Sequence, residues 1–130
     1  MNDLFIGTQG FSFKDWVGPF FPHNTPPDRY LERYSRQFGT VEIDSTFYGI
    51  PKRATVAGWG RRTPSGFRFT AKFPQVITHQ RMLIDCDEVT AHFIETMRDL
   101  GDKLGALLLQ FSYQFGPDRF NALLRYLDGL

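Results

Sequence analysis

Two stretches of the chain alternate apolar and polar residues in the manner of half-buried β-strands. They span residues 40–45 and 67–72. Because successive side chains of a strand point to opposite faces, Glu42 and Asp44 share one face of the first stretch, and Lys72 lies on the polar face of the second. If the two strands are parallel neighbours, two carboxylates and one ammonium group meet at one end of the sheet, where α/β proteins usually place their sites.

The rest of the pattern alternates strands with helices. Short apolar runs at residues 4–7 and 105–110 predict two further strands, and the continuous apolar character of the second run indicates burial on both faces. Four successive pairs of strand and helix predict an α/β fold, with a parallel sheet in the order 1-2-3-4 and helices on one face. The inner face and both edge strands would then be exposed, so we expect the chain to self-associate or to be part of a longer protein. Helical spacing of apolar residues predicts helices at residues 25–39 (Tyr30, Leu31, Tyr34, Phe38), 51–63 (Val56, Trp59), 85–100 (Val89, Phe93, Met97, Leu100) and 118–130 (Phe120, Leu123, Leu124, Leu127).

The composition is that of one ordinary globular domain. With 130 residues, of which 42% are hydrophobic and 16% aromatic, the chain can bury a core. Its 15 basic and 14 acidic residues nearly balance, so the charge gives no general attraction to nucleic acid or to an anionic membrane. The one cysteine, Cys86, excludes an internal disulfide and is expected to be a structural residue near the start of a helix. We find no signal peptide and no apolar run of about 20 residues, and therefore expect no membrane contact and a cytoplasmic location.

Four runs of the sequence resemble the DUF72, or YecE-like, protein family. Residues 6–16 look like the IGTSGWSYxxW start of that family, and residues 40–48 are similar to its TVEINSTFY strand. Residues 69–79 look like its FxxKxPxxITH segment, and residues 100–110 match its LGxxLGxxLxQ strand. The departures from these patterns are Gln9 for a small Ser, Phe11 for Trp, Asp44 for Asn, and Phe111, Ser112 and Tyr113 where a Leu-Pro-Pro run is expected.

The resemblance implies a TIM-barrel-like fold of twice this length. It implies no particular activity. On this basis we expect residues 1–130 to be the N-terminal part of a single such domain, truncated after four βα units, so that the strands of the other half and their site residues are absent.

Polar residues at the ends of the predicted strands form the candidate site. Glu42 and Lys72 are the first candidates for catalysis, together with His79 in the loop after the third predicted strand. A carboxylate beside Lys72 could act as a general base, a metal ligand or half of a structural ion pair. Opposite charges at that range lower the pKa of a carboxyl group and raise that of a lysine. The further candidates for ligand binding are Thr8, Trp16, Asp44, Tyr48 and Gln110.

The sequence leaves the cofactor unknown. Carboxylates and one loop histidine make a divalent metal conceivable, but the sequence offers no pair of histidine ligands, and His23 and His92 are expected at the surface. The loop after the first strand is rich in aromatic residues and is either a lid with Trp16 over the ligand or, as we favour, a loop that buries its own rings.

Several functions remain open on the sequence alone. The chain could belong to a barrel enzyme, or to a binder, for a sugar-, phosphate- or nucleic-acid-like ligand held at the strand C-termini. The alternative is a non-catalytic ligand-binding protein or an inactive fragment.

Overall fold

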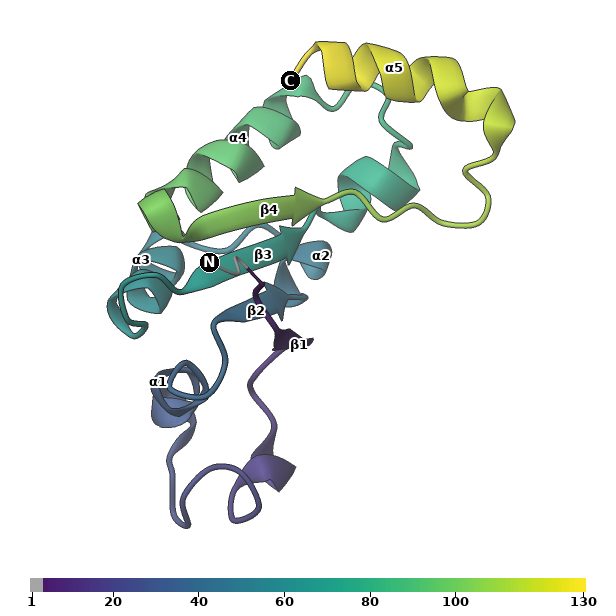
Figure 1. Ribbon diagram of the computed structural model, residues 1–130. Helices are drawn as coiled ribbons and strands as arrows, with labels where there is room; N and C mark the ends of the chain where they lie inside the picture. The colour runs from purple at the N-terminus through teal and green to yellow at the C-terminus, as the bar shows by residue number, and fades with distance from the viewer. Residues whose placement is uncertain (1–3) are drawn as a thin grey trace.

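The strands form one parallel sheet in the order β1-β2-β3-β4, as predicted. The computed structural model describes residues 4–130, so residues 1–3 of the predicted domain lie outside the described residues. Figure 1 shows the strands side by side, with their C-terminal ends at one edge of the sheet. The strand bounds are β1 (Gly7–Gln9), β2 (Thr40–Ile43), β3 (Arg68–Lys72) and β4 (Leu104–Leu108).

Five α-helices are described within residues 4–130, and the four predicted ones are among them. Three short helical segments were not predicted: the 3₁₀ turn η1 (Lys14–Trp16) and the π-helical turn η3 (Val76–Gln80), both in expected loops, and α2 directly after β2. All three are too short to show a helical repeat of apolar residues. The helix bounds are α1 (Tyr30–Tyr34), α2 (Ser45–Tyr48), α3 (Arg53–Arg61), α4 (Asp87–Met97) and α5 (Phe120–Asp128).

The core lies between the helices and one face of the sheet. Val41 of β2 and Phe69 and Ala71 of β3 point into it and are fully buried, whereas their polar neighbours along the strands are partly exposed. From α4, Phe93 and Met97 fill the same layer. The predicted alternation of β2 and β3 is therefore confirmed, and it assigns Glu42 and Lys72 to the inner face.

β1 is held in place by one buried tyrosine. Tyr34 of α1 accepts a hydrogen bond from the backbone N–H of Thr8 (2.7 Å) and donates one to the carbonyl oxygen of Thr40 (2.8 Å). A side chain at Gly7 would collide with that same Thr40 carbonyl, so the close approach of β1 to β2 requires glycine there. Tyr34 thereby fixes the register of β1, on which the identity of the site residues depends.

Two expectations about burial were wrong, for a common reason. β4 is not buried on both faces: Gly105 and Ala106 are exposed and Leu108 is 44% exposed, because β4 is an edge strand whose inner face is uncovered. The apolar stripe of α5 is likewise open to solvent, with Phe120 at 57% and Leu124 at 44% exposure. In Figure 1, α5 (yellow) lies beyond α4, not against the sheet.

α5 instead contacts α4 through Tyr126, which is buried and hydrogen-bonded to Thr90 at 2.8 Å between hydroxyl oxygens. Cys86, at the N-cap of α4, is buried as expected of a structural residue, and burial raises the pKa of its thiol. Among residues 4–130 no helix combines the length and the apolar character needed to cross a membrane.

Candidate functional site

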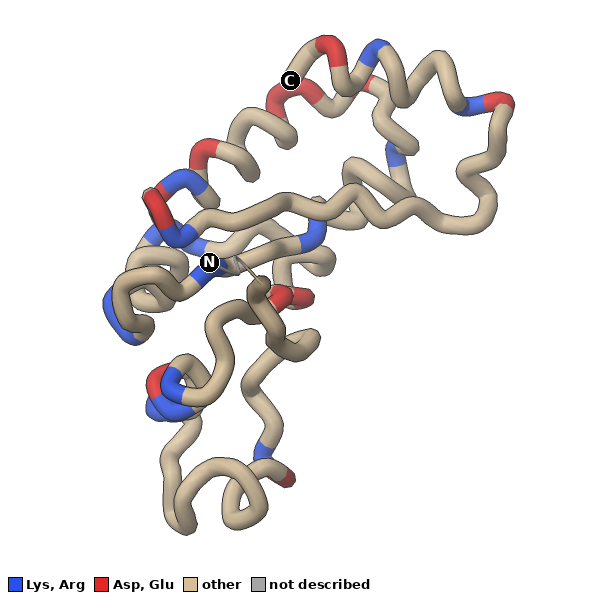
Figure 2. The backbone as a smooth tube through the Cα atoms, viewed as in Figure 1, with Lys and Arg blue, Asp and Glu red and all other residues tan. Residues whose placement is uncertain are grey.

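Lys72 lies at the centre of the candidate site. Its Nζ atom is 3.1 Å from Asp44 Oδ1 and 3.4 Å from Glu42 Oε1, and its side chain is only 14% exposed. The expectation that Glu42 and Lys72 approach within ion-pair reach on the inner face is confirmed. Figure 2 shows basic and acidic segments close together near the C-terminal ends of β3 and β2.

The strand register explains this meeting. Glu42 pairs with Thr70, and Lys72 follows two residues later on the same face of β3. Asp44 comes directly after β2 and is the N-cap of α2, which turns its side chain back toward Lys72. Thr46 of α2 is fully buried and donates a hydrogen bond to the carbonyl oxygen of Lys72 (2.7 Å), so the end of β3 is tied to α2.

The charges in the cluster do not cancel. Burial of the ammonium group lowers the pKa of Lys72, but the neighbouring Asp44 and Glu42 carboxylates outweigh it, and the pKa of Lys72 is raised above its ordinary value. One ammonium group faces two carboxylates, so the cluster carries a net negative charge at neutral pH. Asp44 Oδ1 is buried and, within residues 4–130, makes only the ion pair with Lys72 and no well-directed hydrogen bond.

A pocket of about 190 Å³ opens beside this cluster, at the C-terminal ends of all four strands. Polar groups from four separate parts of the chain converge on it, as the barrel resemblance requires of a ligand site. Larger pockets exist elsewhere. One of about 580 Å³ lies between α4 and α5, and none of the described residues at the strand ends lines it. The residues that line the strand-end pocket are Gln9, Asp44, Phe47, Tyr48, Lys72, His79 and Gln110.

His79, Tyr48 and Gln110, three of the candidates from the sequence, line the pocket. His79 sits in η3, where its ring meets the edge of the Phe47 ring with centroids 5.0 Å apart and its Nδ1 atom lies 2.8 Å from Thr78 Oγ1. Tyr48 is 77% exposed, so one face of its ring is open to a ligand. Glu42 touches the pocket only through its contact with Lys72.

Thr8 and Trp16 lie elsewhere. Thr8 pairs with Val41 and so faces the helices, where its hydroxyl donates to the carbonyl oxygen of Gly10 (2.7 Å); its neighbour Gln9 pairs with Glu42 and takes the inner position. Sequence reasoning missed Gln9 because it placed the strand at residues 4–7, and a three-residue strand shows no alternation of its own.

Trp16 packs inside its own loop, with ring centroids 4.7 Å from Phe13 and 5.4 Å from Phe20, and does not line the pocket. It also stacks near Tyr34 of α1, at 6.4 Å between centroids. The loop buries its aromatic rings only in part, because Phe21 is buried whereas Phe13 and Phe20 are 40% and 37% exposed.

Metal ligands are scarce at this site. Within residues 4–130 no three His, Cys, Asp or Glu side chains are grouped closely enough to hold a metal ion. Glu42 and Asp44 already share Lys72 as their counter-ion.

The raised pKa of Lys72 predicts how stability depends on alkaline pH. A group whose pKa is higher in the folded state stabilises the fold fully below its unfolded pKa, about 10.4 for lysine, and loses that effect as pH rises through the folded value. We expect the difference in unfolding free energy between wild type and Lys72→Met to stay constant from neutral pH to about pH 9.5 and then to shrink. Urea unfolding of both proteins across this range measures it, and the other lysines and tyrosines cancel because both proteins contain them. A difference that grows above pH 10 would rule out the ion pair as the cause.

Comparison with known proteins places the chain in a family. The model of the family described as "Protein of unknown function DUF72" matches residues 5–130. The chain belongs to the DUF72 family. It is 40% identical to the UPF0759 protein YecE of Escherichia coli over 127 residues, which are 98% of this chain and 44% of YecE. It is 32% identical to the UPF0759 protein YunF of Bacillus subtilis, with 95% of this chain and 45% of YunF covered.

Solved structures of DUF72 proteins share the fold. A DUF72 protein of Thermotoga maritima superposes with a TM-score of 0.76 at 32% identity, covering 96% of this chain and 50% of that one. One from Enterococcus faecalis gives a TM-score of 0.76 at 28% identity, covering 94% and 46%. These neighbours are TIM-barrel-like, and the present chain spans about half the length of its relatives. Its four βα units correspond to half of a DUF72 barrel.

Proposed function

We propose that this DUF72 chain supplies half of a site for a small, neutral, hydroxyl-rich ligand of the sugar class. The observation that carries the proposal is the convergence of Lys72, Asp44, His79 and two glutamines on one pocket at the strand C-termini. This is the end of a parallel barrel where ligands bind.

The charge of the cluster argues against an anionic ligand. A phosphate group needs uncompensated cations or free backbone N–H groups, but Lys72 already faces Asp44 and Glu42, and the three together are negative. The negative cluster would repel a negatively charged ligand at short range. The phosphate and nucleic-acid alternatives are therefore less favourable than a neutral ligand, and the near-balanced charge of the whole chain adds no attraction.

The lining groups match a polyol. The side-chain amides of Gln9 and Gln110 each offer a donor and an acceptor, and Asp44 Oδ1 has an acceptor position that no donor among residues 4–130 fills with good geometry. Tyr48 presents an exposed ring that can pack against the apolar face of a sugar. Neighbouring hydroxyl groups, which both donate and accept, satisfy such a mixed set.

Binding is better supported than a specific reaction. A lysine whose pKa is raised stays protonated near neutral pH, so Lys72 is suited to donating hydrogen bonds and not to acting as a general base. We assign Lys72, Asp44 and Glu42 to ligand orientation, and His79 remains the candidate for proton transfer because its imidazole ring lines the pocket. A cytoplasmic location also remains a prediction.

Nuclear magnetic resonance titration of this chain tests the proposal. The probes are D-glucose, D-ribose and myo-inositol, with inorganic phosphate as the anionic comparison. We expect the neutral polyols to shift the side-chain amide signals of Gln9 and Gln110 and the ring signals of His79, with dissociation constants of about 1–10 mM because the pocket of about 190 Å³ is small. Shifts with phosphate and none with the polyols would contradict the proposal.

A further inference from the structure

We propose that a second copy of this chain completes the barrel, with β4 of each copy paired to β1 of the other around a two-fold axis. The proposal concerns the edges and uncovered faces of the half-barrel, and it is independent of which ligand the site binds. The geometry identifies the partner. It must have a sheet of parallel strands whose two outer strands each have a free edge, and the sheet of this chain has both.

The two edges are complementary within one molecule. Within residues 4–130, β1 pairs only with β2 and β4 only with β3, so each has one side without a neighbour. Leu108 offers its carbonyl oxygen to Phe73, toward β3, and by alternation the backbone groups of Leu107 face the free edge. Two sheets of four parallel strands make eight, the number that closes a TIM barrel.

Nothing in β4 protects its edge. Natural edge strands avoid unwanted pairing with charged side chains, proline or bulges that twist the edge away. β4 reads Leu104-Gly105-Ala106-Leu107-Leu108, without a charge or a proline. Its register shift lies at its start, opposite Phe69 and Thr70, and leaves Ala106 to Leu108 regularly paired with β3. Such a strand is ready to accept a further neighbour.

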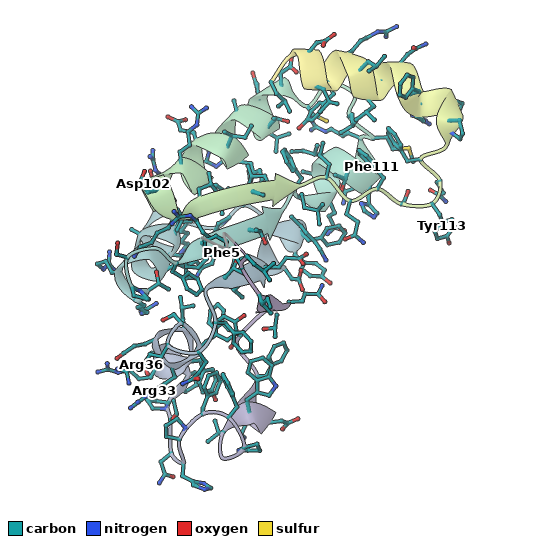
Figure 3. All side chains as sticks on the ribbon, in the orientation of Figure 1. Phe5, Arg33, Arg36, Asp102, Phe111 and Tyr113 are labelled. Carbon is teal, nitrogen blue, oxygen red and sulfur yellow. The ribbon has the colours of Figure 1, made fainter. Side chains whose placement is uncertain are left out.

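Exposed apolar side chains lie at both edges. Beside β1, Leu4 is 73%, Phe5 45% and Ile6 64% exposed. Figure 3 shows Phe5 beside the sheet and, on the segment between β4 and α5, Tyr113 extending outward. On the β4 side, the α5 stripe of Phe120 and Leu124 is open. Closing the barrel would bring the apolar edge of one copy onto that of the other, in two equivalent places.

The length of the relatives supports the same occupant. The T. maritima DUF72 structure matches this chain over 50% of its own length, so a second half of similar size completes that fold. In a dimer of residues 1–130, an identical copy would occupy the place that the second half takes in that structure. The mouth of the closed barrel would then receive a second set of Lys72, Asp44 and His79 from the partner, and the site would be two-fold symmetric.

Analytical ultracentrifugation of this chain without ligand tests the assembly. We expect a species of twice 15.1 kDa at high micromolar concentration. In Ala106→Glu, a charge enters the inner face of β4 at a position that is exposed in the single chain but enclosed in the closed barrel, because Ala106 pairs with Thr70. The dissociation constant should rise at least about 100-fold. Thr55→Glu, on the exposed surface of α3, adds the same charge and should leave the dimer unchanged.

Three outcomes would overturn the proposal. They are a wild type that stays monomeric, open-ended growth without a closed dimer, and a dimer that Ala106→Glu and Thr55→Glu affect equally. Leu124→Glu, on the exposed stripe of α5, is a second interface variant for the case in which Ala106→Glu fails to fold. Because no ligand is present, a failure here is distinct from a failure of the sugar titration.

Discussion

Phe93→Ala is expected to lower the free energy of unfolding by about 3–5 kcal/mol, the largest loss from any single change that we predict. Phe93 is completely buried, and its ring lies 5.2 Å from that of Phe73 between centroids. Removing it empties the layer that joins α4 to the segment directly after Lys72. Urea unfolding monitored by circular dichroism gives the value.

Phe13→Ala is the matched control for this prediction. Phe13 is also a phenylalanine, but it is 40% exposed in the loop after β1. Its replacement should cost about 1 kcal/mol or less, because little buried surface is lost. Equal losses at the two positions would show that α4 does not pack against the sheet as described.

Phe93 also shows what periodicity can predict. The stripe of α4 was assigned correctly because an eleven-residue helix repeats its apolar positions often enough to define one face, and the sheet covers that face. The stripe of α5 is as clear in the sequence, yet Phe120 and Leu124 are exposed. A pattern reveals that a face is apolar, but the surface that covers it can lie outside the described chain.

The sequence predicted the site residues that lie in strands with a clear alternation of apolar and polar side chains. Glu42 and Lys72 lie in strands that alternate apolar and polar residues, so their shared face could be inferred before their distance was known. Gln9 lines the pocket in place of the predicted Thr8. The register of the short strand β1 depends on the contacts of Tyr34 with β1 and β2, which a sequence pattern does not contain. The position of Trp16 likewise depends on the packing of its loop.

Lys72→Met is expected to destabilise the fold by about 2 kcal/mol and to abolish sugar binding. The change leaves Glu42 and Asp44 without their cation, and removing one partner of a buried pair costs more than the pair contributes. The value is smaller than for a fully buried pair because the two carboxylate side chains are 31% and 34% exposed. Urea unfolding and titration with D-ribose measure the two effects separately.

A compensated variant separates the structural role of the cluster from its role in binding. The triple substitution Glu42→Gln, Asp44→Asn and Lys72→Met keeps side chains of similar size and removes all three charges. Replacing a whole buried ion pair by neutral groups of similar volume is often close to neutral for stability. We therefore expect the unfolding free energy of the triple variant to return to within about 1 kcal/mol of wild type.

The titration of this triple variant with D-glucose, D-ribose and myo-inositol is the most direct test of a ligand site built around Lys72. The account predicts a stable protein in which the amide signals of Gln9 and Gln110 no longer respond to any of the three, although wild type responds. If the triple variant binds the polyols as wild type does, or if wild type binds none of them, the cluster is a structural ion pair and the proposed site is contradicted.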